Sequence, residues 1–319
     1  MAGRDMQTLL KLLGDGRFHS GEELGAALGV SRSAVWKRLQ GLESEFGLEV
    51  QSVRGRGYRL AEPLMAIDPQ QVRAPWPLDV LFSVDSTNAE VMRRLDAGAA
   101  TPFAVVAERQ TAGRGRRGRA WVSPFGANLY CTLGISVRGG PKELEGLSLV
   151  VGLAVVRAIQ SLGIAGVGLK WPNDILLDGK KLAGILLELT GDPADLCSVA
   201  IGIGINVNMR AAEGIDQPWT SLREAAGRPV DRNELLAALS RELEWHLARH
   251  REQGFAASQR EWESFHLWQG REVVLSTAAK HIVGRALGID EQGALRLEVD
   301  GVESRFSGGE LSLRLSDDS

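Results

Sequence analysis

The sequence has few cysteines, no dominant charge and no long uninterrupted apolar run. Its 319 residues include only two cysteines, Cys131 and Cys197, and each lies inside an apolar segment. We expect both to be buried and reduced, because thiols persist in the reducing cytosol. The cysteine content therefore favours an intracellular protein.

Membrane and export signals are also missing. Uncharged stretches such as residues 146–156 are shorter than the ~18 apolar residues that a bilayer crossing needs. Residues 1–11 contain polar and acidic side chains and no apolar signal core. The sequence predicts a cytoplasmic protein without membrane attachment.

The net charge of −3, from 37 basic and 40 acidic residues, excludes a wholly basic nucleic-acid coat. That balance hides an uneven distribution along the chain. Residues 1–60 carry a net charge of +2 and residues 105–121 a net charge of +4, which leaves −9 for the remainder. Two positive regions therefore need an explanation.

The chain divides into three segments. At roughly 150 residues per domain, its length alone predicts about two domains, or three if some are small. Residues 1–62 show a helical pattern that ends in a hairpin, residues 66–267 mix helices and strands, and residues 270–319 show short strands. Four prolines between residues 63 and 77 predict a linker.

The first segment has the pattern of a helix-turn-helix. Ser20 and Ser31 are placed to cap two helices that a short turn at Gly29 separates. The second of these helices carries an apolar stripe, formed by Val35, Leu39, Leu42 and Phe46. Its opposite face presents the candidate DNA-contacting residues Arg32, Ser33, Lys37 and Gln40. This pattern predicts a helix that enters the major groove, although such motifs also serve protein contacts.

Residues 51–60 predict a hairpin with glycines at its tip. Arg54, Arg56 and Arg59 decorate it with no acidic residue nearby, as expected of a wing that touches phosphates. Trp36 lies off the apolar stripe of the preceding helix. It either packs on the wing or touches DNA.

Polar and arginine-rich motifs stand out in the central segment. Ser86 begins a helix that follows Asp85, and a helix cap is one explanation for it. Residues 103–110 and 128–137 predict alternating strands. Residues 113–119, between them, hold four arginines and three glycines. Glycine lets the backbone approach an anion and arginine binds phosphate or carboxylate, so this loop predicts an anion site, with a nonspecific nucleic-acid loop as the alternative.

A second polar group follows in residues 170–174, before a hairpin whose turn is Asp178-Gly179. Lys181 stands at the head of the next apolar strand and is either functional or an edge residue that deters aggregation. Glycines at positions 202 and 204 indicate close approach by a ligand. The five histidines are scattered, three of them in or near residues 235–266, which we expect to be a solvated helical scaffold. No metal-ligand spacing or Ser-His-Asp triad is present.

These motifs, in this order, resemble those of the biotin–protein ligases. They are Asp-Ser-Thr-Asn at 85–88, Gln-Thr-Ala-Gly-Arg-Gly-Arg-Arg-Gly-Arg at 110–119, Lys-Trp-Pro-Asn-Asp at 170–174 and Lys-Leu-Ala-Gly at 181–184. The first segment, with Gly-Arg-Gly-Tyr at 55–58, and the tail, with Gly-Ala-Leu at 293–295 and Gly-Gly-Glu at 308–310, resemble the bifunctional bacterial form that also represses the biotin operon. The resemblance covers essentially the whole chain.

The resemblance implies an α+β protein of three domains. These are a winged helix-turn-helix at 1–62, a mixed α/β ligase domain of the class II synthetase-like type at 66–267, and a small SH3-like β-barrel at 270–319. It also implies a two-step reaction that uses ATP, biotin and Mg²⁺, forms biotinyl-AMP and transfers biotin to a lysine of the biotin carboxyl carrier protein. The implied repressor forms a homodimer when biotinyl-AMP is bound and then binds operator DNA.

The resemblance also implies roles for single residues. The implied biotin-binding residues are Ser86, Thr87, Asn88, Gln110, Arg114, Gly115, Arg116 and Lys181. The implied nucleotide-binding residues are Arg119, Trp219, Asn206 and Asn208. The implied catalytic residues are Arg116, Lys181 and Asp174, and no protein metal ligand is implied. Arg54 and Arg56 of the wing join the helix residues as DNA contacts.

Three other functions remain open from the sequence. The chain could be a ligase whose N-terminal module no longer regulates transcription, a regulator that only senses an adenylate, or a lipoate ligase. The arginine-rich loop and Lys181 argue against the second of these, and the loop argues against the third.

Overall fold

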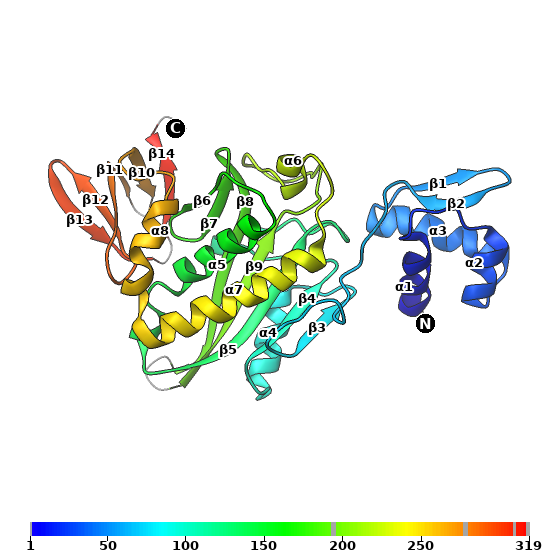
Figure 1. The fold of residues 1–319 in the computed structure, drawn as a ribbon, viewed down its shortest axis with the longest axis horizontal. Helices are drawn as coiled ribbons and strands as arrows, with labels where there is room; N and C mark the ends of the chain where they lie inside the picture. Colours follow the sequence, from blue (N-terminus) through cyan, green and yellow to red (C-terminus); the bar gives the residue numbers. More distant parts are fainter. Residues whose placement is uncertain (1, 193–195, 277–279, 309–310, 317–319) are drawn as a thin grey trace.

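The computed structural model describes residues 2–192, 196–276, 280–308 and 311–316 (Figure 1). A small helical module lies at one end of the molecule, a large sheet with its helices lies in the middle, and a group of short strands lies at the other end. This is the mixed α and β architecture that the sequence predicts.

The N-terminal module contains three helices and a hairpin. Its elements are α1 (Ala2–Leu13), α2 (Gly21–Leu28), α3 (Arg32–Phe46), β1 (Val50–Val53) and β2 (Gly57–Leu60). The predicted caps are confirmed, because the Ser20 hydroxyl accepts from the Glu23 N–H and the Ser31 hydroxyl accepts from the Ala34 N–H. Gly29 ends α2 in the left-handed conformation. The predicted apolar stripe of α3 packs inward with α1 and α2.

The central segment is built on a seven-stranded sheet. Its strands are β3 (Leu78–Leu81), β4 (Phe103–Ala107), β5 (Leu129–Arg138), β6 (Val167–Lys170), β7 (Asp174–Leu177), β8 (Lys180–Gly191) and β9 (Leu196–Ile205). The strand order is β3-β4-β5-β9-β8-β7-β6, in which β3 and β4 are parallel and the other neighbours antiparallel. Asp178 and Gly179 form the predicted β7–β8 turn, with φ angles of 51° and 74°.

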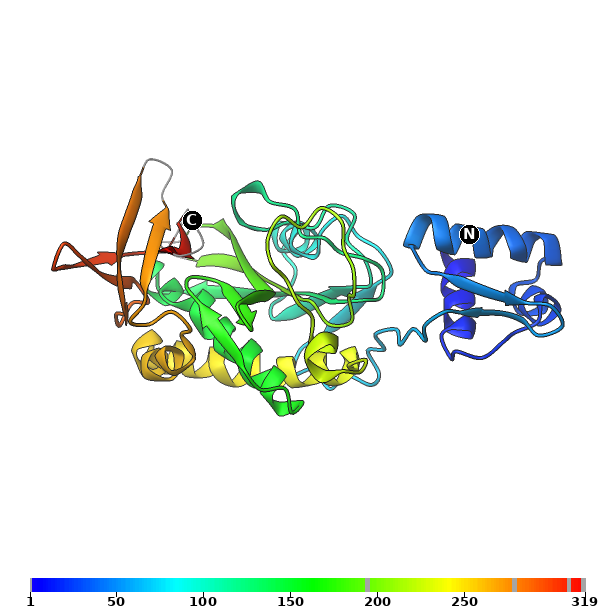
Figure 2. The same cartoon turned by 90° about the horizontal axis from the view of Figure 1, so that it is seen from above.

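Helices cover both faces of this sheet, so its middle strands are buried (Figure 2). Helix α4 (Thr87–Asp96) packs on Phe103, Val105 and Ala200, whereas α5 (Leu147–Ser161) packs with the side chains of the opposite face. The alternation predicted for residues 103–110 is therefore wrong for β4, all five residues of which are buried. Cys131 and Cys197 are buried free thiols, as predicted.

The helical region 235–266 is not a solvated scaffold. Helix α7 (Arg232–Gln253) packs along α5, and His246, His250 and His266 are all buried. The polar composition of α7 concealed this packing because its buried leucines occupy a narrow stripe. The other short helical elements are α6 (Leu222–Ala226), α8 (Gln259–Phe265), η1 (Arg116–Gly118), η2 (Pro141–Leu144) and η3 (Phe255–Ser258).

Within the described residues, one helical segment is long and apolar enough, by length and composition alone, to cross a membrane. Residues Pro141–Ser161 meet that criterion, and 61% of the most apolar part is buried inside the protein. Because α5 lies between the sheet and α7, its apolar character is that of a core helix.

The predicted proline-rich linker is shorter than its composition suggests. Ile67 and Val72 are buried against the central segment, and the Ile67 N–H donates to Glu108 at 2.7 Å. The side chains of Phe46, Phe82 and Phe125 meet at ring-centre distances of 4.9–5.4 Å, so α3 also touches the central segment. Only the few residues after β2 remain as a connection.

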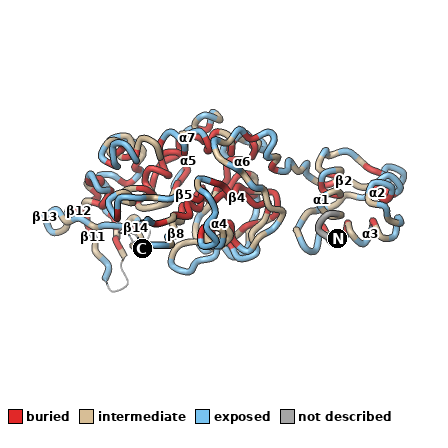
Figure 3. The backbone as a smooth tube through the Cα atoms, turned by 90° about the horizontal axis from the view of Figure 1, so that it is seen from below, coloured by how far each residue is buried: buried red, intermediate tan, exposed pale blue. Residues whose placement is uncertain are grey.

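The C-terminal strands form a five-stranded antiparallel sheet whose apolar core is continuous with the central one. They are β10 (Glu272–Ser276), β11 (His281–Ile289), β12 (Leu295–Val299), β13 (Val302–Phe306) and β14 (Ser312–Leu315), in the order β13-β12-β11-β10-β14. Strand β13, at the outer end of this region, is mostly exposed (Figure 3). The indole N–H of Trp171 donates to the Gly293 carbonyl at 3.0 Å, which joins the two regions. Gly309 and Glu310, part of the predicted tail motif, lie outside the described residues.

Candidate functional site

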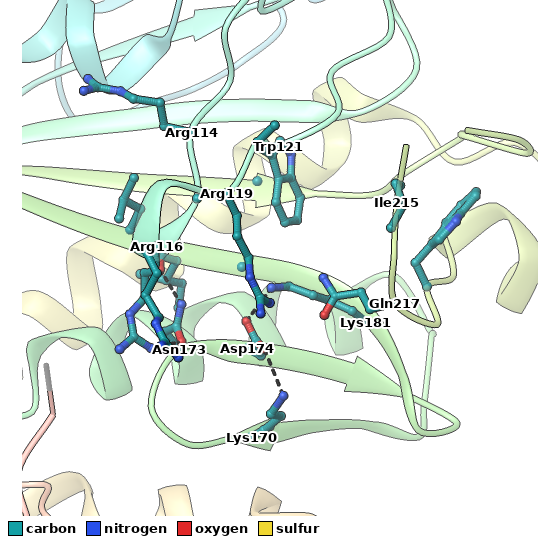
Figure 4. Close-up of a pocket in the computed structure, with 18 of the residues that line it drawn as sticks. Arg114, Arg116, Arg119, Trp121, Lys170, Asn173, Asp174, Lys181, Ile215 and Gln217 are labelled. Atoms are coloured by element: carbon teal, nitrogen blue, oxygen red, sulfur yellow. Dashed lines mark hydrogen bonds and ion pairs between the residues drawn. The ribbon is translucent and has the colours of Figure 1, made fainter. Parts of the chain in front are cut away.

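A cavity of about 850 Å³ opens between the central sheet and the C-terminal strands (Figure 4). It is lined by the start of α4, the loop at 114–122, the β6–β7 connection, the segment at 214–219 and the residues at 311–314. The sequence places these segments far apart, and the sheet topology brings them to one place.

The cavity floor under α4 is a closed polar network. Gln110 accepts hydrogen bonds from the N–H and hydroxyl of Thr87 at 2.9 and 3.1 Å, and its amide donates to the Ser123 hydroxyl at 3.0 Å. Ser86 accepts from the Ala89 N–H as the cap of α4. The cap explanation is therefore confirmed, and Ser86 lines the cavity as well.

The arginine-rich loop is folded over the cavity. The Gly115 N–H donates to the Arg119 carbonyl at 2.7 Å, and Arg117 takes a left-handed φ of 59°. Arg116 donates to the Asn173 side chain at 2.7 Å and to the Leu311 carbonyl at 3.1 Å. Figure 4 shows Arg119 pointing toward Asp174, whereas Arg114 points away from it. The loop thus turns some of its arginines inward.

A lysine–aspartate–lysine group forms the opposite wall. Asp174 lies 2.7 Å from the Lys181 ammonium and 3.3 Å from that of Lys170. Burial alone would raise the pKa of Asp174, but the two ammonium charges outweigh it and hold this pKa below its usual value. Burial lowers the pKa of Lys170, an effect that the Asp174 charge opposes. The backbone of Lys181 pairs with β7 on one side and with Pro218 and Thr220 on the other, so Lys181 is not an edge residue.

Trp121 lies on the backbone of two glycines. A Cβ atom at Gly204 would lie 2.6 Å from the indole, and one at Gly184 would lie 3.2 Å from it. Likewise, a Cβ atom at Gly202 would meet the Asn88 carbonyl oxygen at 2.0 Å. The close approach predicted at positions 202 and 204 is therefore present, but side chains of the protein itself make it.

Comparisons with known proteins agree with these segments. Descriptions of three families match the chain: the Biotin/lipoate A/B protein ligase family at residues 70–206, an HTH domain at 5–59 and the Biotin protein ligase C terminal domain at 270–314. The Bifunctional ligase/repressor BirA of Escherichia coli K12 is 44% identical over 311 residues, which cover 96% of each chain.

This chain belongs to the biotin protein ligase family.

Solved and curated members of that family cover most of the chain. The Aquifex aeolicus biotin protein ligase in complex with biotin and ATP has a TM-score of 0.67 and 35% identity, and the match covers 75% of this chain and 99% of that one. The Biotin--[acetyl-CoA-carboxylase] ligase of Mycobacterium tuberculosis is 38% identical over 240 residues, 73% of this chain and 88% of its own. The family assignment therefore includes the cavity and the strands beside it.

The cavity unites nearly all of the ligand-binding residues predicted from the sequence. Those that line it are Ser86, Thr87, Asn88, Gln110, Arg114, Gly115, Arg116, Arg119, Asp174, Lys181, Asn206 and Trp219. Asn208 is the exception. Its side chain pairs with the N–H and carbonyl of Val230, both at 2.9 Å, and so anchors a loop away from the cavity.

Several residues that line this cavity were not predicted from the sequence. They are Trp121, Lys170, Asn173, Ile215, Gln217, Trp268 and Arg314. Lys170 and Asn173 belong to the motif at residues 170–174, of which only Asp174 was predicted as a site residue. Arg314 carries no local signal, because only the packing of β14 against the central segment brings it to the cavity.

The candidate DNA-contacting residues all lie on exposed surfaces of the N-terminal module. They are Arg32, Ser33, Lys37, Gln40, Arg54 and Arg56. Arg56 and Arg59 also stack on the Phe18 ring, at 4.4 and 4.6 Å from its centre. Trp36 is 50% exposed, so it does not pack into the module.

The described residues contain no cluster of three or more His, Cys, Asp or Glu side chains suited to a metal ion. Both oxygens of Asp174 face ammonium groups, which compete with a cation for that carboxylate.

Proposed function

We propose that this chain is an ATP-dependent biotin–[biotin carboxyl carrier protein] ligase that forms biotinyl-AMP and then transfers biotin to a carrier lysine. We also propose that it represses biotin-synthesis genes when biotinyl-AMP is bound. The observation that carries the enzymatic proposal is the shared cavity, in which a polar floor, an arginine loop and Lys181 face one another.

The polar floor is suited to the ring of biotin. Ser86, Thr87 and Gln110 offer hydroxyl and amide groups in a largely buried setting, which suits a cyclic urea that both donates and accepts hydrogen bonds. Trp121 and the flat glycine backbone beneath it offer apolar contact to the remaining part of biotin. We place the biotin carboxylate near Lys181 at the other end of this floor.

The chemistry at the carboxylate is activation by adenylation. A carboxylate oxygen attacks the α-phosphate of ATP and pyrophosphate leaves, so negative charge must be stabilised as the transfer proceeds. Lys181 is held by Asp174 and supplies a fixed positive charge there. Arg116 and Arg119 add charge from the loop side, and Trp219 and Asn206 line the region we assign to the nucleotide.

In the second step, the amine of a carrier lysine attacks the activated carbonyl and AMP leaves. The positive groups that assist adenylation also stabilise the departing AMP phosphate. The closed loop keeps water from the mixed anhydride, which would otherwise hydrolyse. The reaction needs no nucleophilic side chain of the ligase itself.

The enzymatic proposal is tested by incubation with ATP, Mg²⁺ and biotin, followed by mass measurement of bound biotinyl-AMP and by labelling of a carrier domain. We expect both products. Lipoate is offered in parallel, and labelling with lipoate in preference to biotin would support the lipoate ligase alternative. Adenylate formation without labelling of the carrier would instead indicate a ligand-sensing regulator.

The regulatory proposal concerns the N-terminal module. We assign it a winged helix-turn-helix architecture in which α3 enters the major groove and the β1–β2 hairpin contacts phosphates. The adenylate-bound form would pair into a homodimer and bind operator DNA in the cytoplasm. Footprinting at biotin-operon promoters with biotinyl-AMP tests this, and unprotected DNA would favour a ligase that does not regulate.

We further propose the domain division 1–62, 66–267 and 270–319. The apolar cores support a boundary after the N-terminal module, whose cluster is separate from the main core and is joined from the central segment by Phe82 and Phe125. The mixed sheet supports a class II synthetase-like central domain, and the five short strands support an SH3-like unit.

A further inference from the structure

We propose that Glu188 is a positioning residue that connects the fixed floor of the cavity to the arginine-rich loop, an inference that rests on the proposed biotin site. Glu188 lies on β8, and its side chain is 28% exposed. One carboxylate oxygen contacts Asn88 on α4 and the other contacts Arg114 in the loop. One side chain therefore joins two parts of the site that the sequence separates.

The floor side of this connection is rigid. Asn88 is buried, and its amide nitrogen donates to Glu188 at 2.8 Å and to the Leu186 carbonyl at 3.2 Å. Its carbonyl oxygen accepts from the Thr132 hydroxyl at 2.7 Å and lies against Gly202. An amide group has two donor hydrogens, and both are used within the protein. Asn88 is thus part of the fixed frame and has no hydrogen left to donate to biotin.

On the loop side of the connection, the Arg114 side chain is partly exposed and less constrained than Asn88. The Arg114 guanidinium lies 3.3 Å from Glu188, is 44% exposed and points away from Asp174 (Figure 4). The backbone of Arg114 nevertheless pairs with that of Ala120, at the two ends of the loop. We infer that the Arg114 side chain holds the loop in place while other arginines face the ligands.

The expected effect of this ion pair is modest, because a partly exposed pair shifts an equilibrium by about fivefold at most. If the pair favours the folded-over loop, its loss lowers the fraction of protein that is ready to hold biotin, and the apparent affinity falls by the same factor. The rate of the adenylation step, which Lys181 assists, is unaffected once biotin is bound. The signature is a higher KM for biotin with an unchanged kcat.

The test is a double-mutant cycle on the full chain, with adenylation as the assay. Glu188→Gln keeps an oxygen that accepts from Asn88 but removes the charge that pairs with Arg114. We expect KM for biotin to rise about threefold to fivefold in Glu188→Gln, in Arg114→Gln and in the double variant alike. Arg114→Lys should restore most of the loss, and Lys180→Gln, an exposed change on the same strand, should have no effect.

A second measurement does not depend on the proposed reaction. Trypsin cleaves after arginine, so the cleavage rate of the loop in the ligand-free protein should rise in Glu188→Gln and not in Lys180→Gln. Unchanged cleavage together with an unchanged KM would overturn the role of Glu188, as would additive effects in the cycle. If the wild-type protein forms no biotinyl-AMP, the ligase proposal is refuted. The cleavage rates would still show whether Glu188 holds the arginine-rich loop in place.

Discussion

A lysine at the head of an apolar strand has two opposite explanations, and its place in the sheet separates them. Lys181 lies on an interior strand and pairs with Asp174, so it does not protect an edge. The sequence could identify Lys181 from its motif but could not supply the pairing, because Lys170 and Asp174 become its neighbours only after β6, β7 and β8 pair.

Replacement of Lys181 by methionine should lower the rate of biotinyl-AMP formation by about 100-fold or more. The change keeps the apolar stem and removes one preorganised charge, a loss of the size measured for similar groups. Single-turnover formation of biotinyl-AMP measures it. Lys180→Met, which alters an exposed neighbour, should retain the wild-type rate, and equal losses in both variants would contradict the assignment.

His266 gives the protein a predictable response to acid. Both its ring nitrogens are buried with no hydrogen-bond partner among the described residues, and burial lowers its pKa to about 4. The unfolded chain, with an ordinary value near 6.5, binds the proton first, so stability is complete above about pH 6.5 and falls as the pH drops toward 4.

His266→Phe keeps a flat ring beside Trp262 and removes the titration. Thermal midpoints between pH 7 and 4.5 should therefore fall less steeply in this variant than in the wild type. The full contribution of such a group is on the order of 3 kcal/mol. Parallel curves for the two proteins would show that His266 does not cause the loss.

At the scale of elements, the sequence predicts best those features that depend on contacts between residues close together in the chain. The caps of α2 and α3 and the Asp178-Gly179 turn depend on adjacent residues, so the sequence was enough to predict them. The burial of α7 and of both faces of β4 depends on distant partners, and their local composition pointed elsewhere. Tertiary packing overrides periodicity in such elements.

The close packing of the Trp121 ring on the backbone of strand β9 can be tested at Gly204. Gly204→Ala would place a methyl group 2.6 Å from the Trp121 indole and force that ring to move. We expect at least a tenfold weaker affinity for biotin with an almost unchanged fold, as measured by titration calorimetry and circular dichroism. Wild-type affinity in this variant would show that Trp121 does not form a wall of the biotin site.

At the scale of the whole molecule, a small set of contacts docks the N-terminal module. Glu62, next to the hairpin, accepts hydrogen bonds from Arg210 at 2.9 Å and from Arg223 at 2.6 Å. The pairing with Arg223 is the first cause of the lowered pKa of Glu62. The sequence could not reveal these partners, which are about 150 residues away.

Glu62→Gln should loosen this docking without unfolding either part. We expect a larger radius of gyration in solution scattering and faster protease cleavage between residues 61 and 65. The thermal midpoint should change little, because partly exposed ion pairs contribute about 1 kcal/mol or less. Unchanged scattering would mean that the aromatic contact at Phe46 is sufficient to hold the module.

The continuity of the apolar core across the central and C-terminal strands determines where this chain can be divided. Two fragments separated near residue 64 would each keep the greater part of their own packing. A cut near residue 269 would instead expose the core on both sides and leave the Trp171 indole without its acceptor. Split reporters, fusions and inserted tags should therefore use the first junction and avoid the second.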